Sequence, residues 1–497
     1  MTGPSPAPLP AADTVTSVNP EGPPVHADVR FVRDIEDWTS RLGVFIISIV
    51  LFRLGFELWW VGRIHENVWV QLWVVLFYAG GLAFLFMSFL RMRHVKLHLV
   101  GFLTLLLALA FYAIVVLTVV NVHYTSDAML FVHQAAAEFA AGNNPYTRDL
   151  IAGYDQFRVP YYVETPTTSG GQVSNLNYPA LAFLVYVPFV LLGVPDIRPV
   201  SLAFLLALLT LFYLATPKHL RLLATSVLFL SSFFISFSIS SVDIVFIYFL
   251  VAGAVLWERN KNWAMLFVGL AAATKQVVWF VVPFLLVALY METRDRIPAV
   301  KWRKIGVASA WGAGAFLLPN LPFIVMDPGA WFRGVLTPFG LTQETLAPLS
   351  QGITVPFYTG LARFDPMLLH LAAGIVMLVL LGVYWMRYER LKHFAWVVPP
   401  FVLAFTERTL QNYYEMFYPV GILLLARLYP LADRHPAEES ATPEAAGDDA
   451  AGPAAPAAGR PAGGVGGPLA TAIVLPSSVT PRRDDRPSRL SARRPEE

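Results

Sequence analysis

Apolar runs of about 20 residues recur along most of the chain, and a helix of this length crosses the hydrocarbon core of a bilayer, which is roughly 30 Å thick. Hydrophobic residues make up 56% of the 497 residues and charged residues only 14%, with a mean hydropathy of +0.56. Soluble domains rarely show this balance. The runs also lack the polar and apolar alternation of barrel strands. We therefore expect an all-α, polytopic bundle of about 11–13 transmembrane helices, one for each run or piece of a run.

The predicted spans lie within a transmembrane domain at 39–431. They run near 42–62, 68–90, 97–122, 178–216, 222–240, 242–257, 263–290, 305–326, 353–387, 394–410 and 412–429. Pro188 and the Pro-rich segment 193–199 leave room for a break within 178–216. A second break is expected near Lys275, where an ionisable residue interrupts an apolar run.

The two ends of the chain differ from this domain in composition. Residues 1–38 and 432–497 are rich in Pro, Ala and Gly and contain few large apolar side chains. Such segments bury too little surface to offset the entropy of folding, so we expect disordered tails.

Charge and cysteine content exclude several functions. The formal net charge is +2, which gives no electrostatic argument for a nucleic-acid partner. The chain has no cysteine, which excludes disulfides, thiolate metal sites and a cysteine nucleophile.

Short basic loops predict the orientation, because Lys- and Arg-rich loops face the cytoplasm. These loops are 91–96, 218–221, 258–262, 301–304 and 387–393. With them inside, residues 121–177 form a large external loop carrying short helices, and the tails lie in the cytoplasm. The orientation also requires an odd number of crossings between 178 and 216. We expect a multi-pass protein of the plasma membrane whose functional face lies outside.

Polar residues from distant segments meet at that external face in this orientation. They are Asp127, Asp243, Lys275, Gln276, Asn320, Asp327, Glu407, Arg408, Gln411, Asn412 and Tyr413. Ionisable groups at membrane depth are costly and usually functional. The sequence therefore predicts that these residues line one cavity.

Several segments carry a family resemblance. They are "TSDAMLFVHQAAAEFAAGNNPY" from Thr125, "NYPALAFLVYVPF" from Asn177, "SSVDIVFIYFL" from Ser240, "NLPFIVMDPGAWFRGVL" from Asn320 and "QNYYEMFYPVGILLLARL" from Gln411. In this order they resemble the polytopic GT-C glycosyltransferases, most closely the polyprenol-phosphate-mannose-dependent mannosyltransferases of glycosyltransferase family 87. The similarity covers most of the chain between about residues 100 and 430, and the tails lie outside it.

The resemblance implies transfer of a sugar, favouring mannose, from a polyprenyl-phosphate donor to a glycolipid or glycan acceptor of the cell envelope. It makes Asp127, at the start of the external loop, the catalytic base. Some GT-C enzymes have two adjacent acidic residues and a metal ion, but the neighbour here is Ser126. We therefore expect no cofactor and no metal ligands.

The residue types fit such chemistry. A carboxylate near an attacking hydroxyl contributes roughly 10²- to 10⁴-fold in rate, and Asp127 is placed for this role. A departing phosphate needs fixed positive charge, for which Lys275 and Arg408 are the candidates. A single displacement inverts the anomeric centre and needs no enzyme nucleophile. The candidate substrate-binding residues are Asn144, Tyr146, Tyr178, Asp243, Gln276, Gln411, Asn412 and Tyr413.

Structural alternatives remain for the charged candidates. Asp127 and Asp243 are also suitable helix N-caps, and Asp327 precedes a proline as turn residues often do. Lys275 could extend from a helix end toward the membrane surface. A metal site at His123, Asp127 and His133 is disfavoured, because His133 lies off the helical face that the other two share.

Two alternatives from other classes stay open: a secondary transporter, and a non-catalytic membrane scaffold or lipid-linked-sugar flippase. A transporter would also be all-helical, with broken segments and charges in the membrane. A scaffold or flippase would explain the spans but would not need an acid, a lysine and an arginine that converge outside. Transporters usually contain internal repeats, and the second half of this chain has no counterpart of the "TSDAMLF" loop.

Overall fold

The computed structural model describes residues 29–61, 67–90, 96–120, 123–159, 164–167, 170–339, 349–350, 355–359, 361, 366–406 and 408–428. The chain divides into two units, Met1–Asp433 and Arg434–Glu497, and every described residue belongs to the first. Residues 432–497, predicted as a tail, lie outside the described part.

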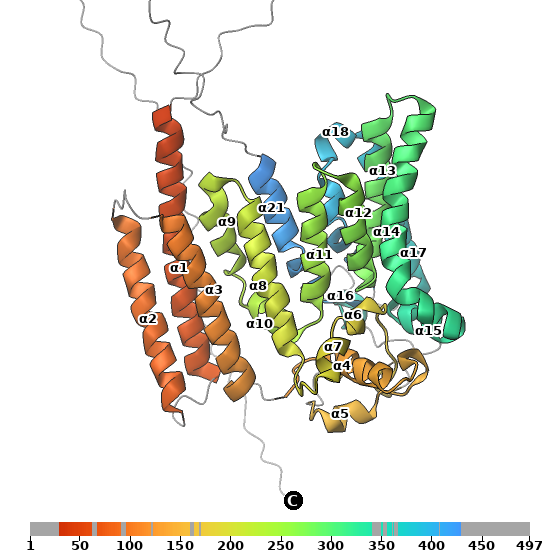
Figure 1. Cartoon of the computed structure of the whole chain (residues 1–497), viewed down its shortest axis with the longest axis horizontal. Helices are drawn as coiled ribbons and strands as arrows, with labels where there is room; N and C mark the ends of the chain where they lie inside the picture. The colour runs from red at the N-terminus through yellow and green to blue at the C-terminus, as the bar shows by residue number, and fades with distance from the viewer. Residues whose placement is uncertain are drawn as a thin grey trace, which may run out of the picture. The chain divides into compact units, whose positions relative to one another are not determined.

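Three long helices begin the described chain, and they are drawn in red and orange in Figure 1. They are α1 (Val29–Val61), α2 (Val68–Phe89) and α3 (Leu97–Val115), which continues as a short π-helix, η1 (Val116–Val120). Helix α1 begins inside the predicted tail 1–38, so the predicted boundary at residue 39 falls within a helix. Within α1, Arg53 Nε lies 3.1 Å from Glu57 Oε1, a pairing that lowers the cost of burying two charges.

Short helices and turns follow η1 and fold against one end of the bundle. They are α4 (Asp127–Ala140), η2 (Pro145–Thr147), α5 (Ala152–Gln156), α6 (Leu181–Leu184) and α7 (Val187–Leu191). Gly142 turns the chain away after the end of α4, and a residue with a side chain adopts its φ of +84° only with strain. In Figure 1, α4 and α5 lie at the lower end of the bundle.

The remaining elements return the chain through the bundle. They are α8 (Arg198–Ala215), η4 (Lys218–Leu220), α9 (Arg221–Leu228), α10 (Ser232–Ser240), α11 (Asp243–Leu256), α12 (Lys261–Ala272), η5 (Gln276–Phe280), α13 (Val281–Thr293), α14 (Pro298–Met326), α15 (Pro328–Leu336), η6 (Thr337–Phe339), α16 (Val355–Tyr358), α17 (Pro366–Met386), α18 (Tyr388–Leu391), η7 (Phe394–Val397), α19 (Pro399–Leu403), α20 (Asn412–Glu415) and α21 (Tyr418–Leu428). Two parallel two-residue strands, β1 (Leu349–Ser350) and β2 (Arg408–Thr409), pair with each other. The all-α, polytopic prediction is confirmed.

Seven helices in the described part are long and apolar enough to cross a membrane, or eight if the bent pair α10 and α11 counts as one span. This is fewer than the 11–13 predicted. Helix α12 has 12 residues and is therefore about 18 Å long, whereas a span needs about 20 residues. Apolar composition predicted the runs correctly, but it overestimated how many are uninterrupted helices.

Both predicted breaks are present. Between 178 and 216, α6 and α7 are too short to span and only α8 is long enough, which gives the odd number of crossings that the basic loops require. The second break separates α12 from η5 at residues 273–275. In Figure 1, α9 and α18 lie at the upper end of the bundle, opposite α4, α5 and α15. The basic segments 218–221 and 387–393 therefore share one end.

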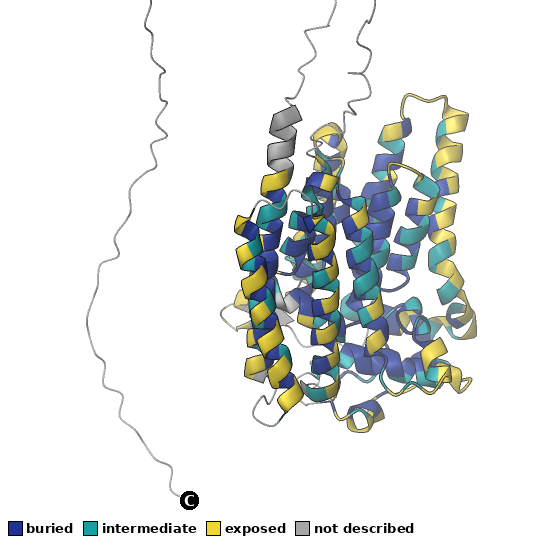
Figure 2. Ribbon diagram, turned by 60° about the vertical axis from the view of Figure 1, so that its left-hand side comes forward, coloured by how far each residue is buried: buried dark blue, intermediate teal, exposed yellow. Residues whose placement is uncertain are grey.

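The outer helices are apolar on both faces. Helix α2 buries Val70, Val74 and Phe77 while Trp69 and Phe86 are exposed. Figure 2 shows such exposed positions along the outside of the bundle and buried ones inside. A helix that is hydrophobic all round is typical of a membrane span, and the chain is a multi-pass membrane protein.

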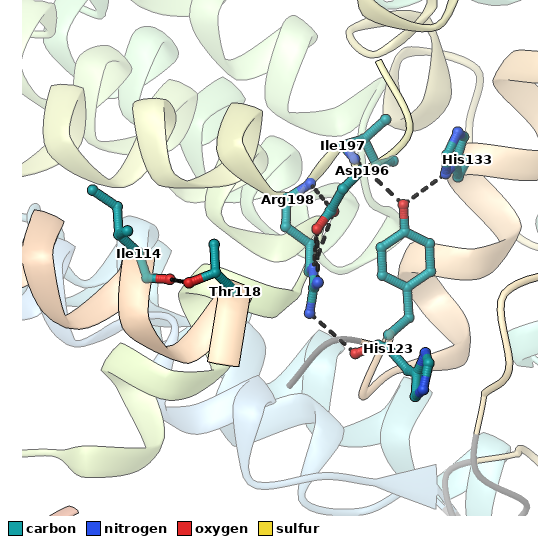
Figure 3. Close-up of polar contacts among 8 residues, drawn as sticks. Ile114, Thr118, His123, His133, Asp196, Ile197 and Arg198 are labelled. Atoms are coloured by element: carbon teal, nitrogen blue, oxygen red, sulfur yellow. Dashed lines mark hydrogen bonds and ion pairs between the residues drawn. The ribbon is translucent and has the colours of Figure 1, made fainter. Parts of the chain in front are cut away.

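A polar network attaches the segment before α4 to the start of α8. Arg198 pairs with Asp196 at 2.7 Å and donates to the backbone carbonyl of His123 at 3.0 Å, as drawn in Figure 3. The Tyr124 hydroxyl lies 2.6 Å from His133 Nδ1 and accepts from the Ile197 N–H. These contacts fix where α4 begins, and therefore where Asp127 lies.

Candidate active site

A cavity of about 310 Å³ lies where α4, the start of α11, η5, η6, α17 and the segment after α19 meet. The predicted site residues that line it are Asp127, Tyr178, Asp243, Lys275, Gln276, Arg408, Asn412 and Tyr413. They come from segments up to 286 positions apart in sequence, the separation of Asp127 and Tyr413. The structure thus brings most of the predicted residues together.

Asp127 is the first residue of α4, but it is not the helix cap. The Ser126 hydroxyl accepts from the Ala128 N–H at 3.1 Å and takes that role. The Asp127 side chain is half-buried and lines the cavity. Burial raises the pKa of the carboxyl, while a hydrogen bond from Thr165 and the charge of Arg408 oppose the rise. A carboxylate with a raised pKa beside a cation is suited to accept a proton.

Arg408 holds its position through backbone and side chain. It belongs to β2, which pairs with β1 at Leu349. Its Nη2 donates to Thr165 Oγ1 at 3.2 Å, and Thr165 also lines the cavity. A guanidinium in this position can meet phosphate oxygens with two parallel hydrogen bonds.

A buried ion pair joins the two sides of the cavity. The Lys275 ammonium donates to Asp243 Oδ1, and Asn412 Nδ2 donates to Asp243 Oδ2 at 2.7 Å. Lys275 is only 7% exposed, and its Nζ lies 5.4 Å from the ring centroid of Tyr413 and 5.8 Å from that of Tyr178. Lys275 is therefore inside the protein rather than extended toward a membrane surface.

Two predicted residues hold the backbone of the cavity wall. Gln276 Nε2 donates to the carbonyls of Asn177 and Val335 at 2.7 and 2.8 Å. The Tyr146 hydroxyl donates to the carbonyl of Tyr178 at 2.8 Å, from outside the cavity lining. Both residues position the segment that contains Asn177 and Tyr178.

Other predicted residues lie away from the cavity lining. Asn144 accepts from the Tyr146 N–H at 3.1 Å and caps η2. Asn320 is buried and accepts from the Ala180 N–H and the Trp331 indole. Asp327 caps α15 by accepting from the Ala330 N–H, and Gln411 is exposed and bonded to Glu415. Glu407 lies outside the described residues.

The prediction missed polar residues that line the cavity, among them Thr165, Asn177, Ser241 and His370. Asn177 could have been found, because it directly precedes Tyr178 in the "NYPAL" segment. Thr165 lies in a loop without hydrophobic periodicity, so no pattern marks it.

Within the described part of the chain, no three His, Asp or Glu side chains are grouped to hold a metal ion. His133 is buried against Tyr124, and this burial lowers the pKa of the imidazole. It is therefore a packed residue on the inner face of α4.

Comparison with known families gives one match. The sequence model described as glycosyltransferase family 87 matches residues 176–406. This region contains Tyr178, Asp243 and Lys275, whereas Asp127 precedes it and Arg408 follows it. No curated protein and no solved structure matches the chain.

Proposed function

Because the chain is related to glycosyltransferase family 87 and is a membrane glycosyltransferase, we propose that it transfers mannose from polyprenyl-phosphate-mannose to a hydroxyl of a glycolipid or glycan acceptor. The observation that carries the proposal is the cavity in which a half-buried carboxylate, Asp127, lies beside Arg408. The residues of this cavity supply a base and fixed positive charge, which are the groups that such a transfer needs.

Asp127 acts as the base in this proposal. The acceptor O–H gives its proton to the carboxylate while its oxygen forms a bond to the anomeric carbon of the sugar. The bond from that carbon to the phosphate oxygen breaks, and its electron pair leaves with the lipid phosphate. One displacement of this kind inverts the anomeric configuration.

Arg408 and Lys275 receive the phosphate. Arg408 lines the cavity on the Asp127 side and can bind two phosphate oxygens at once. Lys275 forms an ion pair with Asp243, but its ammonium has three N–H donors, so it can also donate to a phosphate oxygen. Fixed donors of this kind stabilise charge that develops on a leaving group.

A lipid-linked donor is supported by a second hollow of about 670 Å³, which is lined almost wholly by apolar residues of α12, η5, α13, α14 and α15. It adjoins the cavity through η5, because Trp279 lines the hollow while Gln276 and Phe280 line the cavity. The hollow offers an apolar place for an isoprenoid chain beside the proposed phosphate site.

A donor comparison tests the proposal. Purified protein in lipid discs is given a membrane lipid extract and radiolabelled mannose, linked either to polyprenyl phosphate or to a nucleotide. We expect a labelled product from the lipid-linked donor alone, formed much more slowly with Asp127→Asn. Label from the nucleotide-linked donor, or no transfer from either, would contradict the proposed donor.

A further inference from the structure

The side chain of Asn177 has a buried polar atom that no described residue pairs with, which is unusual. It is 9% exposed, lines the cavity, and its Oδ1 has no hydrogen-bond partner among the described residues. Burying a polar atom without a partner costs free energy. Other buried side-chain atoms without partners belong to residues elsewhere in the described chain, and none of those residues lines the cavity.

Hydrogen bonds and close packing hold the backbone at Asn177. Gln276 Nε2 donates to the Asn177 carbonyl at 2.7 Å, and the Tyr146 hydroxyl donates to the next carbonyl at 2.8 Å. On the preceding side, a Cβ on Gly334 would lie 2.4 Å from the carbonyl oxygen of Leu176, so α15 packs closely against this segment. The backbone of the segment 176–178 is therefore held on both sides of Asn177.

An unpaired acceptor on a side chain that lines a cavity is suited to bind a donor from a ligand. The ligands of the proposed function carry hydroxyl groups on every sugar, and a sugar hydroxyl is a donor of the right size. A site built to bind a hydroxyl discriminates strongly against an analogue that lacks it, because the protein group is then left unpaired.

We propose that Asn177 Oδ1 accepts a hydrogen bond from a hydroxyl of a bound sugar and that Asn177 selects the sugar by this contact. The inference rests on the proposed function. It assigns Asn177 to substrate recognition, whereas Asp127 performs the proton transfer.

A substitution cycle with modified donors tests this assignment. Transfer is measured for polyprenyl-phosphate-mannose and for its 2-, 3-, 4- and 6-deoxy analogues, with the unchanged protein and with Asn177→Ala. We expect Asn177→Ala to lower kcat/KM for the full sugar by about tenfold, as loss of one hydrogen bond does. For one deoxy analogue, which lacks the contacted hydroxyl, the two proteins should differ little.

Asn175→Ala is the matched control, because Asn175 is exposed, lies two positions away and does not line the cavity. Asn175→Ala should leave the ratio of kcat/KM between the full donor and each deoxy donor unchanged. Each ratio compares two donors with the same variant, so partial unfolding does not alter it.

The outcomes separate the sources of the hydroxyl. If the effect of Asn177→Ala on kcat/KM disappears for one deoxy donor, the contacted hydroxyl belongs to the transferred sugar. If the effect is the same for every donor and the transfer rate rises less steeply with acceptor concentration, the hydroxyl belongs to the acceptor. Equal donor ratios and an unchanged acceptor response would overturn the inference while leaving the proposed function intact. Failure of the unchanged protein to transfer mannose would overturn both.

Discussion

At the scale of single residues, the neighbours of Asp127 explain why it is available for chemistry. Ser126 caps α4, so the carboxylate of the next residue is not needed for the helix. Burial raises the pKa of this carboxyl, while a hydrogen bond from Thr165 and the charge of Arg408 lower it. The charge of Arg408 is therefore one of the causes that set the protonation state of the proposed base.

Arg408→Gln should move the acid limb of the pH profile to higher pH. Asp127 is a base only when deprotonated, so activity is present above its pKa and is lost as the pH falls through it. Removing Arg408 removes a cause that lowers this pKa, and the loss then begins at higher pH. The measurement is kcat/KM against pH, with Arg387→Gln, an exposed arginine outside the cavity lining, as control. An acid limb that stays in place or moves to lower pH would show that Arg408 does not act on the base.

At the scale of elements, the ion pair of Asp243 and Lys275 connects α11 to the break before η5. Asp243→Asn should destabilise the protein by about 3–5 kcal/mol, because it leaves a buried ammonium without its counter-charge. Adding Lys275→Met should restore much of this loss. Thermal unfolding in lipid discs measures both. If the loss in the free energy of unfolding of the double variant equals the sum of the losses of Asp243→Asn and Lys275→Met alone, the two residues are not coupled.

The close packing of α12 against α14 depends on glycine. A Cβ on Gly269 would lie 2.1 Å from the carbonyl oxygen of Gly312, so Gly269→Ala must push the two helices apart. We expect Gly269→Ala to lower the free energy of unfolding by about 1–3 kcal/mol, as at other overpacked sites. Gly314→Ala on α14 is the control, because a Cβ there meets no atom within 4 Å. Equal melting temperatures for the two variants would argue against this contact.

At the scale of the whole molecule, the sequence predicted the helical class and both chain breaks, because Pro188 and Lys275 interrupt apolar runs for clear physical reasons. It also predicted that Asp127, Asp243 and Arg408 would share a cavity, since the loop charges constrain the topology. It could not show that Gln276 binds backbone carbonyls, or that the Asn177 amide is unpaired. Those facts depend on tertiary packing, which hydrophobic periodicity does not encode.

The predicted orientation can be tested directly, because the chain has no cysteine of its own. Asp155 is exposed on α5, and Arg387 is exposed at the start of a basic segment. A membrane-impermeant maleimide added to intact cells should label Asp155→Cys and should not label Arg387→Cys. The reverse pattern would place the cavity end in the cytoplasm, where nucleotide sugars are available as donors.

We propose above all that Asp127 accepts the proton during transfer and is not needed for binding the donor. The most direct test is the single-turnover transfer rate from pre-bound polyprenyl-phosphate-mannose in Asp127→Asn, with Asp155→Asn as an exposed carboxylate control in the same loop. We predict a rate that is lower by roughly 10²- to 10⁴-fold, with donor affinity close to that of the unchanged protein and of the control. An unchanged rate would remove Asp127 from the mechanism, and a lost donor affinity would make it a binding residue instead.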